Sequence, residues 1–206
     1  MKHIKQLTLT SIAALALTAV VGVASASAFS TFRAESAPVK LTGTQNQTLT
    51  FSTDAGTLSC GGGSLSGELT STTSSSFEAT PSFGGCSYLG VNGLSINTNG
   101  CKYRFYASGS ADIVCSEGAA IWYSVAGCTV TVPAQTGIQW IGLGNSGAGS
   151  GRSVNLSYSV GNLKYMTSGF CTTSGVGSFS NGVLYGGATN VVAKTLKGAP
   201  VGFWVA

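Results

Sequence analysis

The chain has 206 residues, of which only 8% are charged and 30 are glycine. Ten basic residues against six acidic ones give a net charge of +4, which is too weak a balance to predict a nucleic-acid partner. Charged residues usually make up about a quarter of a domain, so Ser, Thr, Asn and Gly must supply most of the polar surface here.

The first 28 residues have the pattern of a secretory signal peptide. Lys2, His3 and Lys5 precede an apolar run, and the small residues ASASA (24–28) follow it. We expect cleavage after Ala26 or Ala28 and a secreted or extracytoplasmic protein, either free or associated with the cell surface. The alternative is a retained anchor, because the apolar run is close to the roughly 17 residues that can span a bilayer. After cleavage we expect no integral membrane segment.

Cleavage after Ala28 would leave 178 residues (206 minus 28), enough for one domain with a buried core. We expect residues 29–37 to form a flexible N-terminal tail and residues 38–206 to form the domain. Short alternating runs are separated by Gly, Ser and Asn, as at 47–53, 64–71, 93–98, 153–160 and 162–168. This pattern predicts an all-β fold. We expect a single antiparallel β-sandwich, Ig-like or jelly-roll-like. The glycine-rich segment 142–152 is predicted to be a mobile surface loop.

The six cysteines predict three disulfides, because an even number in an exported chain is typical of a disulfide framework. They are Cys60, Cys86, Cys101, Cys115, Cys128 and Cys171. Six cysteines allow 15 pairings, so local geometry must select among them. Short Cys-x-x-Cys spacing, which would favour zinc or redox chemistry, does not occur.

Residues 101–115, CKYRFYASGSADIVC, predict a hairpin with its turn at Ala107-Ser108-Gly109. The register pairs Cys101 with Cys115, Tyr103 with Ile113, Arg104 with Asp112 and Phe105 with Ala111. The apolar residues and both cysteines then share one face, because side chains alternate along a strand. We expect a Cys101–Cys115 disulfide and a cross-strand charge pair between Arg104 and Asp112.

The next segment predicts a second hairpin, with its turn at Ala126-Gly127. Its register pairs Val125 with Cys128, Tyr123 with Val130 and Ile121 with Val132. Trp122, Ser124, Thr129 and Thr131 then lie on the outer face, and Cys128 points into the core. By elimination we pair Cys60 with Cys86 and Cys128 with Cys171.

Catalytic groups are scarce. The only histidine is His3, so the mature chain has no Ser-His or Cys-His pair. A hydrolase would depend on Asp54, Glu68, Glu78, Asp112 and Glu117. Of these, we expect Asp112 to pair with Arg104 and the two strand glutamates to be solvated. Gly142, Gly144 and Gly147 match a dinucleotide motif, but neither the helix nor the downstream acid that it requires follows. We therefore expect no catalytic residue, no cofactor and no metal.

Tryptophans are the remaining candidates for a binding site. Trp122 falls on the polar face of its hairpin, Trp140 borders the glycine-rich segment, and Trp204 lies near the C-terminus. An exposed indole among hydroxyl groups can stack on a sugar ring, and we single out Trp122 and Trp140 for this role. The alternative is that a second sheet or a loop covers these rings, because most tryptophans are largely buried.

Three runs resemble a known group of proteins: FEATPSFGGCSYLG (77–90), CKYRF (101–105) and DIVCSEGAAIWYSVAGCTVTVPAQTG (112–137). Together they are similar to a group of uncharacterised small exported cysteine-containing proteins of soil actinobacteria. The resemblance implies a bacterial origin and an extracytoplasmic location. It implies no site residues.

We therefore expect an exported, non-enzymatic surface or extracellular-matrix protein. Its expected partner is cell-wall or extracellular glycan, or another component of the cell envelope. Two alternatives stay open. One is a secreted hydrolase that uses Asp and Glu as acid and base, and the other is a structural subunit that assembles through sheet edges.

Overall fold

The computed structural model describes residues 29–139, 142–171 and 176–206. The predicted signal peptide and its cleavage site lie outside the described residues, as does Trp140. The described residues contain no helix long and apolar enough to cross a membrane.

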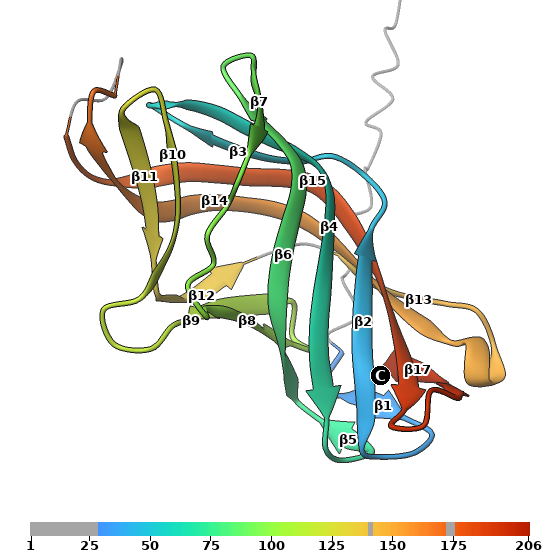
Figure 1. Cartoon of the computed structure of the whole chain (residues 1–206). Coiled ribbons are helices and arrows are strands. Elements are labelled where there is room, and N and C mark those ends of the chain that lie inside the picture. The colour runs from blue at the N-terminus through green and yellow to red at the C-terminus, as the bar shows by residue number, and fades with distance from the viewer. Residues whose placement is uncertain (1–28, 140–141, 172–175) are drawn as a thin grey trace, which may run out of the picture.

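Seventeen strands and one short 3-10 helix make up the described part of the chain (Figure 1). In chain order they are β1 (Phe32–Ala34), β2 (Val39–Gln45), β3 (Leu49–Thr53), β4 (Gly56–Leu69), β5 (Thr73–Ser74), β6 (Ser76–Tyr88), β7 (Val91–Leu94), β8 (Lys102–Tyr106), β9 (Ser110–Val114), β10 (Ala120–Val125), β11 (Cys128–Pro133), β12 (Gln135–Gln139), β13 (Leu143–Ser146), η1 (Gly149–Gly151), β14 (Ser153–Gly169), β15 (Gly177–Thr195), β16 (Pro200–Val201) and β17 (Phe203–Val205).

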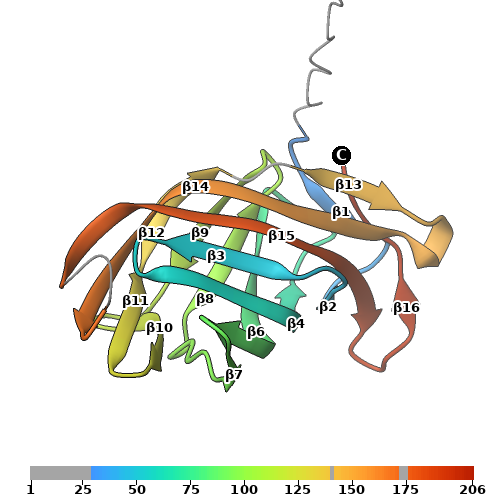
Figure 2. The same ribbon diagram turned by 90° about the horizontal axis from the view of Figure 1, so that it is seen from above.

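Most strands belong to one 14-stranded antiparallel sheet, whose main path runs β10-β11-β14-β15-β2-β4-β6-β8-β9-β12. A second, three-stranded sheet has the order β17-β1-β5. The two longest strands, β14 and β15, cross the molecule side by side (Figures 1 and 2). The fold is thus all-β and antiparallel, as the sequence predicted.

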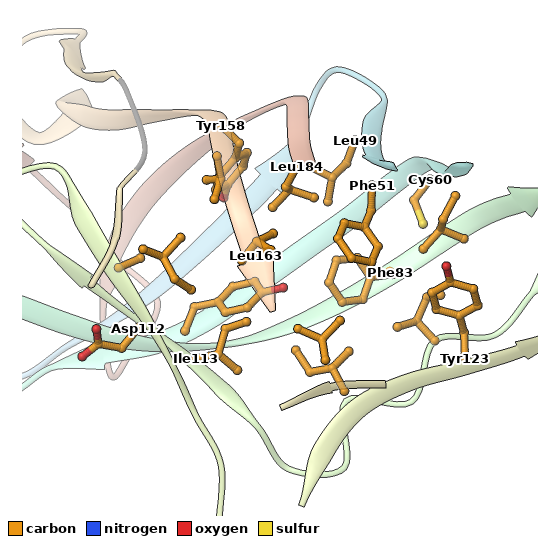
Figure 3. A pocket seen from close by; sticks show the side chains of 18 of the residues that line it. Leu49, Phe51, Cys60, Phe83, Asp112, Ile113, Tyr123, Tyr158, Leu163 and Leu184 are labelled. Atoms are coloured by element: carbon orange, nitrogen blue, oxygen red, sulfur yellow. The ribbon is translucent and has the colours of Figure 1, made fainter. Parts of the chain in front are cut away.

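The large sheet curls until β12, at one end of its path, lies beside β14. The side chain of Gln135 on β12 joins the two strands. Its Nε2 donates to the carbonyl oxygen of Lys164 at 3.1 Å, and the Lys164 N–H donates to its Oε1 at 3.0 Å. Opposite parts of the sheet therefore face each other across one interior, where a cavity remains (Figure 3).

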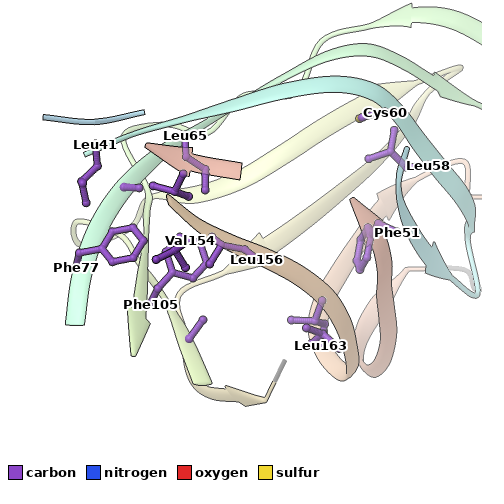
Figure 4. Close-up of a cluster of buried hydrophobic side chains, with 14 of the residues drawn as sticks. Leu41, Phe51, Leu58, Cys60, Leu65, Phe77, Phe105, Val154, Leu156 and Leu163 are labelled. Carbon is purple, nitrogen blue, oxygen red and sulfur yellow. The ribbon is translucent and has the colours of Figure 1, made fainter. Parts of the chain in front are cut away.

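The core fills the rest of this interior with aliphatic and aromatic side chains (Figure 4). Along the strands these alternate with outward polar ones, as in β2. Burial of such side chains stabilises each by about 1.5–3 kcal/mol. At one end Phe32, Phe77 and Phe203 pack ring against ring, with centroids 4.9–5.9 Å apart. Phe32 belongs to β1 and is fully buried. The flexible tail predicted for residues 29–37 is therefore wrong for Phe32–Ala34, which pair with both β17 and β5.

All three predicted disulfides are present: Cys60–Cys86, Cys101–Cys115 and Cys128–Cys171. Cys60 and Cys86 lie directly opposite each other on β4 and β6. No cysteine in the described ranges is free. Such a framework is characteristic of proteins that fold in an oxidising, extracytoplasmic environment.

Both predicted hairpin registers are confirmed. Tyr103 pairs with Ile113 in β8–β9, and Tyr123 pairs with Val130 in β10–β11. One detail is wrong: Arg104 lies opposite Asp112, but its guanidinium bonds Glu78 on β6. The short segment 142–152 also differs from its prediction, because Leu143–Ser146 form β13 and pair with β14. Asn145 ties this strand to Val205 through two hydrogen bonds of 2.8 Å.

Candidate functional site

The outer face of β11, β14 and β15 carries an open groove of about 660 Å³, which we call the outer groove. Its lining combines hydroxyl, amide, ammonium and apolar groups: Pro133, Lys164, Tyr165, Met166, Ser178, Phe179, Ser180 and Asn181. Pro133, Lys164 and Met166 come from outward positions of β11 and β14, because side chains alternate along each strand. These residues form the outward wall of the groove, while the buried ring of Tyr165 reaches it from the inner side of β14.

Trp122 lies on the same outer face, on the strand next to β11, whose Pro133 lines the outer groove. Its side chain belongs to the edge strand β10, and the residue is 39% exposed. The register places Trp122 opposite Thr131, and Thr131 opposite Met166 at the groove. The backbone of Trp122 is held by Asn97, through N–H···O bonds of 2.9 and 2.8 Å. An exposed indole and the groove thus form one continuous surface.

Hydroxyl groups flank the indole on this surface. Thr129 Oγ1 donates to Ser124 Oγ at 3.0 Å, across the β10–β11 hairpin. Ser168 lies opposite Thr129 on β14. A flat aromatic ring with hydroxyls beside it offers both stacking and hydrogen bonding to one ligand.

A hydrogen-bonded network holds the floor of the outer groove. The Tyr165 hydroxyl donates to Asn181 Oδ1 at 3.1 Å and accepts the N–H of Asp54 at 3.0 Å. Asn181 Nδ2 donates to Asp54 Oδ2 at 2.8 Å. The Tyr165 ring stacks on Phe179 with centroids 5.2 Å apart. Burial raises the pKa of Tyr165, which favours the neutral hydroxyl that donates to Asn181.

Two tryptophans were predicted to stack on a sugar. The structure describes Trp122, which is exposed, while Trp140 lies outside the described residues. Trp204 is half-buried beneath Arg152, whose guanidinium carbon lies 5.0 Å from the ring centroid. The covered alternative therefore holds for Trp204. Met166 and Phe170 were missed, although they are 41% and 87% exposed. The alternation of the run NLKYMTS, with Tyr165 inward, would have placed Met166 outward.

The acidic residues do not meet in the outer groove. Asp112 is buried and accepts bonds from the Tyr106 hydroxyl at 2.7 Å and the Gly137 N–H at 2.9 Å. It is therefore neither exposed nor paired with Arg104, because β12 covers it. Glu78 is not simply solvated either. Its hydrogen bond with Arg104 lowers its pKa, which is opposite to what a general acid needs.

The described residues show no group of three or more His, Cys, Asp or Glu side chains that could hold a metal ion. No family model, curated protein or solved structure matches this chain. The resemblance to small exported proteins of soil actinobacteria stays a prediction.

Proposed function

We propose that this protein is exported and binds glycan, without catalysis, through Trp122 and the outer groove. The observation that carries the proposal is the row Trp122, Thr131 and Met166, which leads from an exposed indole directly to the groove. The basic start and apolar run at the N-terminus support export, together with the three disulfides. Cell-wall or extracellular polysaccharide is the expected partner.

Sugar rings suit this surface for a physical reason. Their C–H faces are apolar enough to stack on an indole, while their hydroxyls need hydrogen-bond donors and acceptors around the ring. Ser178, Ser180 and Lys164 line the outer groove and supply such groups. Ser124 and Thr129 supply them beside Trp122.

The test is sedimentation of the purified mature protein with insoluble peptidoglycan, chitin and cellulose. We expect at least one polysaccharide to retain the wild type, and Trp122→Ala to weaken that retention by about tenfold or more. Tyr185→Ala is the matched control, because Tyr185 is 45% exposed on β15 and does not line the outer groove. The proposal would be contradicted if Trp122→Ala were retained as well as the wild type. It would also be contradicted if none of the three polysaccharides retained the wild type.

The hydrolase alternative has less support from the geometry. Glu68 and Glu78 are opposite each other on β4 and β6, but Glu78 is held by Arg104 and Lys102. This alternative would be favoured over simple binding if the protein released soluble sugar from a polysaccharide that it binds, and if Glu68→Gln or Glu78→Gln abolished that release.

A further inference from the structure

The interior of the curled sheet holds a cavity of about 90 Å³ that is separate from the outer groove. Its lining is almost wholly apolar and comes from opposite parts of the sheet, as Phe51 and Leu184 on one side and Ile138 on the other illustrate. Figure 3 shows Phe51 and Leu184 among the side chains that line the cavity. Apolar cavities stay dry, and larger ones bind apolar molecules.

One polar group that lines this cavity has no partner within the described part of the chain. The hydroxyl of Tyr123 is buried and makes no hydrogen bond there, and the residue is only 2% exposed. Figure 3 shows its ring rising from β10 with the hydroxyl end turned to the interior. Burial raises the pKa of Tyr123, so the group remains a neutral hydroxyl that can donate.

Two tyrosines near Tyr123, Tyr88 and Tyr158, differ from it in this respect. The Tyr88 hydroxyl, whose ring centroid lies 5.6 Å from that of Tyr123, donates to the carbonyl oxygen of Ala55. The Tyr158 hydroxyl donates to Thr189 Oγ1 at 3.4 Å. Asp112 also borders the cavity, and its two carboxylate oxygens each accept a hydrogen bond, from Tyr106 and from Gly137. A buried hydroxyl is normally satisfied, so the exception at Tyr123 points to a missing partner.

A water molecule is a poor partner here, because a buried water needs two to four polar groups around it. An organic molecule with one oxygen would satisfy the hydroxyl and fill the apolar space together. A cavity of about 150 Å³ binds benzene, so this smaller one suits about four non-hydrogen atoms.

We propose that the interior cavity is a binding site for a small, neutral aliphatic molecule with one oxygen, which accepts a hydrogen bond from the Tyr123 hydroxyl. The site is independent of glycan binding at Trp122. Ligand enters as a whole and leaves unchanged, and no covalent step is involved.

The experiment compares two probes of about four non-hydrogen atoms each, acetone and 2-methylpropene. The two molecules have the same shape, but 2-methylpropene has a methylene group where acetone has its carbonyl oxygen. Binding is followed by NMR through the methyl signals of Ile138 and Leu184, which line the cavity. We expect both probes to shift these signals in the wild type. In Tyr123→Phe the ketone affinity falls about fivefold, whereas the alkene affinity stays the same.

Two further variants make the test specific. Tyr185→Phe removes a hydroxyl from an exposed tyrosine outside the cavity and leaves both affinities unchanged. Ala111→Ile fills the cavity from β9 and abolishes both; if it does not fold, the Tyr123→Phe comparison decides alone. The proposal is overturned if neither probe shifts the methyl signals at saturation, if Tyr123→Phe changes both affinities equally or neither, or if a folded Ala111→Ile still binds.

Discussion

Arg104 on β8 holds Glu78 on β6 through two hydrogen bonds, 2.6 Å from Nη2 and 3.0 Å from Nε to the same carboxylate oxygen. Lys102 adds a longer contact of 3.5 Å to the other oxygen. The ladder also places Glu68 opposite Glu78, and Lys40 opposite Glu68. Two like charges are thus neighbours across β4 and β6, and each has a cation on its far side. The arrangement offsets the repulsion that two adjacent glutamates would otherwise produce.

The first prediction concerns the pH dependence of this pair. The folded pKa of Glu78 lies below its ordinary value of 4.5, so its contribution to stability is present above about pH 4.5 and is lost as the pH falls through the folded pKa. The pair is more than a third exposed, which limits that contribution to about 1 kcal/mol or less. Glu78→Gln should therefore lower the free energy of unfolding at pH 7 and leave it nearly unchanged near pH 3.

Urea unfolding at both pH values measures this difference. Glu117→Gln is the control, because Glu117 is exposed between β9 and β10 and its removal should change the free energy by less than about 0.5 kcal/mol. High salt should shrink the effect of Glu78→Gln by screening. An effect that is equal at pH 3 and pH 7 would show that the ion pair does not stabilise the fold.

The second prediction concerns the closure of the sheet by Gln135. Its side-chain amide takes the place of a backbone peptide against Lys164, with one bond donated and one accepted. Gln135→Met keeps the length of the side chain and removes both bonds. We expect the free energy of unfolding to fall by about 1–2 kcal/mol, and the Lys164 amide to exchange its hydrogen faster than in the wild type.

Hydrogen exchange followed by NMR resolves this amide. Gln139→Met is the matched control, since Gln139 is exposed on the same strand and pairs through its backbone with Ser110. Unchanged protection of the Lys164 amide in Gln135→Met would mean that the closure does not depend on this side chain.

Sequence reasoning predicted the local pairings and missed the distant ones. The registers of β8–β9 and β10–β11 follow from alternation and turn residues within about 15 positions of each other. The partner of Arg104 does not, because Glu78 is 26 residues earlier in the chain. Asp112 is polar yet buried, since β12 packs over it and Gly137 donates to it. These contacts depend on the curl of the whole sheet.

The candidate site was predicted only in part for the same reason: its local strand pairing follows from the sequence, but its long-range contacts do not. Alternation placed Trp122 outward beside Thr131, and the structure agrees. The outer groove was not predicted, because it requires β11 to lie beside Met166 on β14. The sequence does not predict β13, because it lies within the glycine-rich run 142–152. Its contact on the three-stranded sheet, Val205, is 60 residues away from Asn145.

The third prediction ranks two of the disulfides. A cross-link stabilises a fold more when it closes a longer loop, by about 3 kcal/mol for 15 residues and about 4 kcal/mol for 40 to 50. Cys128–Cys171 closes 43 residues and Cys101–Cys115 closes 14. Replacement of each pair by alanines should therefore cost about 1 kcal/mol more for Cys128 and Cys171. Urea unfolding of the two double variants measures the order, and the reverse order would refute the loop-length argument for this chain.

The fourth prediction concerns Gly169, the last residue of β14. Its φ is +82°, and a Cβ at this position would overlap the carbonyl oxygen of Gly127 in the β10–β11 turn. Backbone on both sides cannot give way as a flexible side chain would. Gly118 has a similar φ of +73° but open space around it. Gly118→Ala should therefore cost only the conformational penalty of about 1–2 kcal/mol, whereas Gly169→Ala should cost at least about 1 kcal/mol more. Equal losses in the two variants, measured by urea unfolding, would show that β14 can move away from the β10–β11 turn and that the close approach of Gly169 to Gly127 does not constrain the fold.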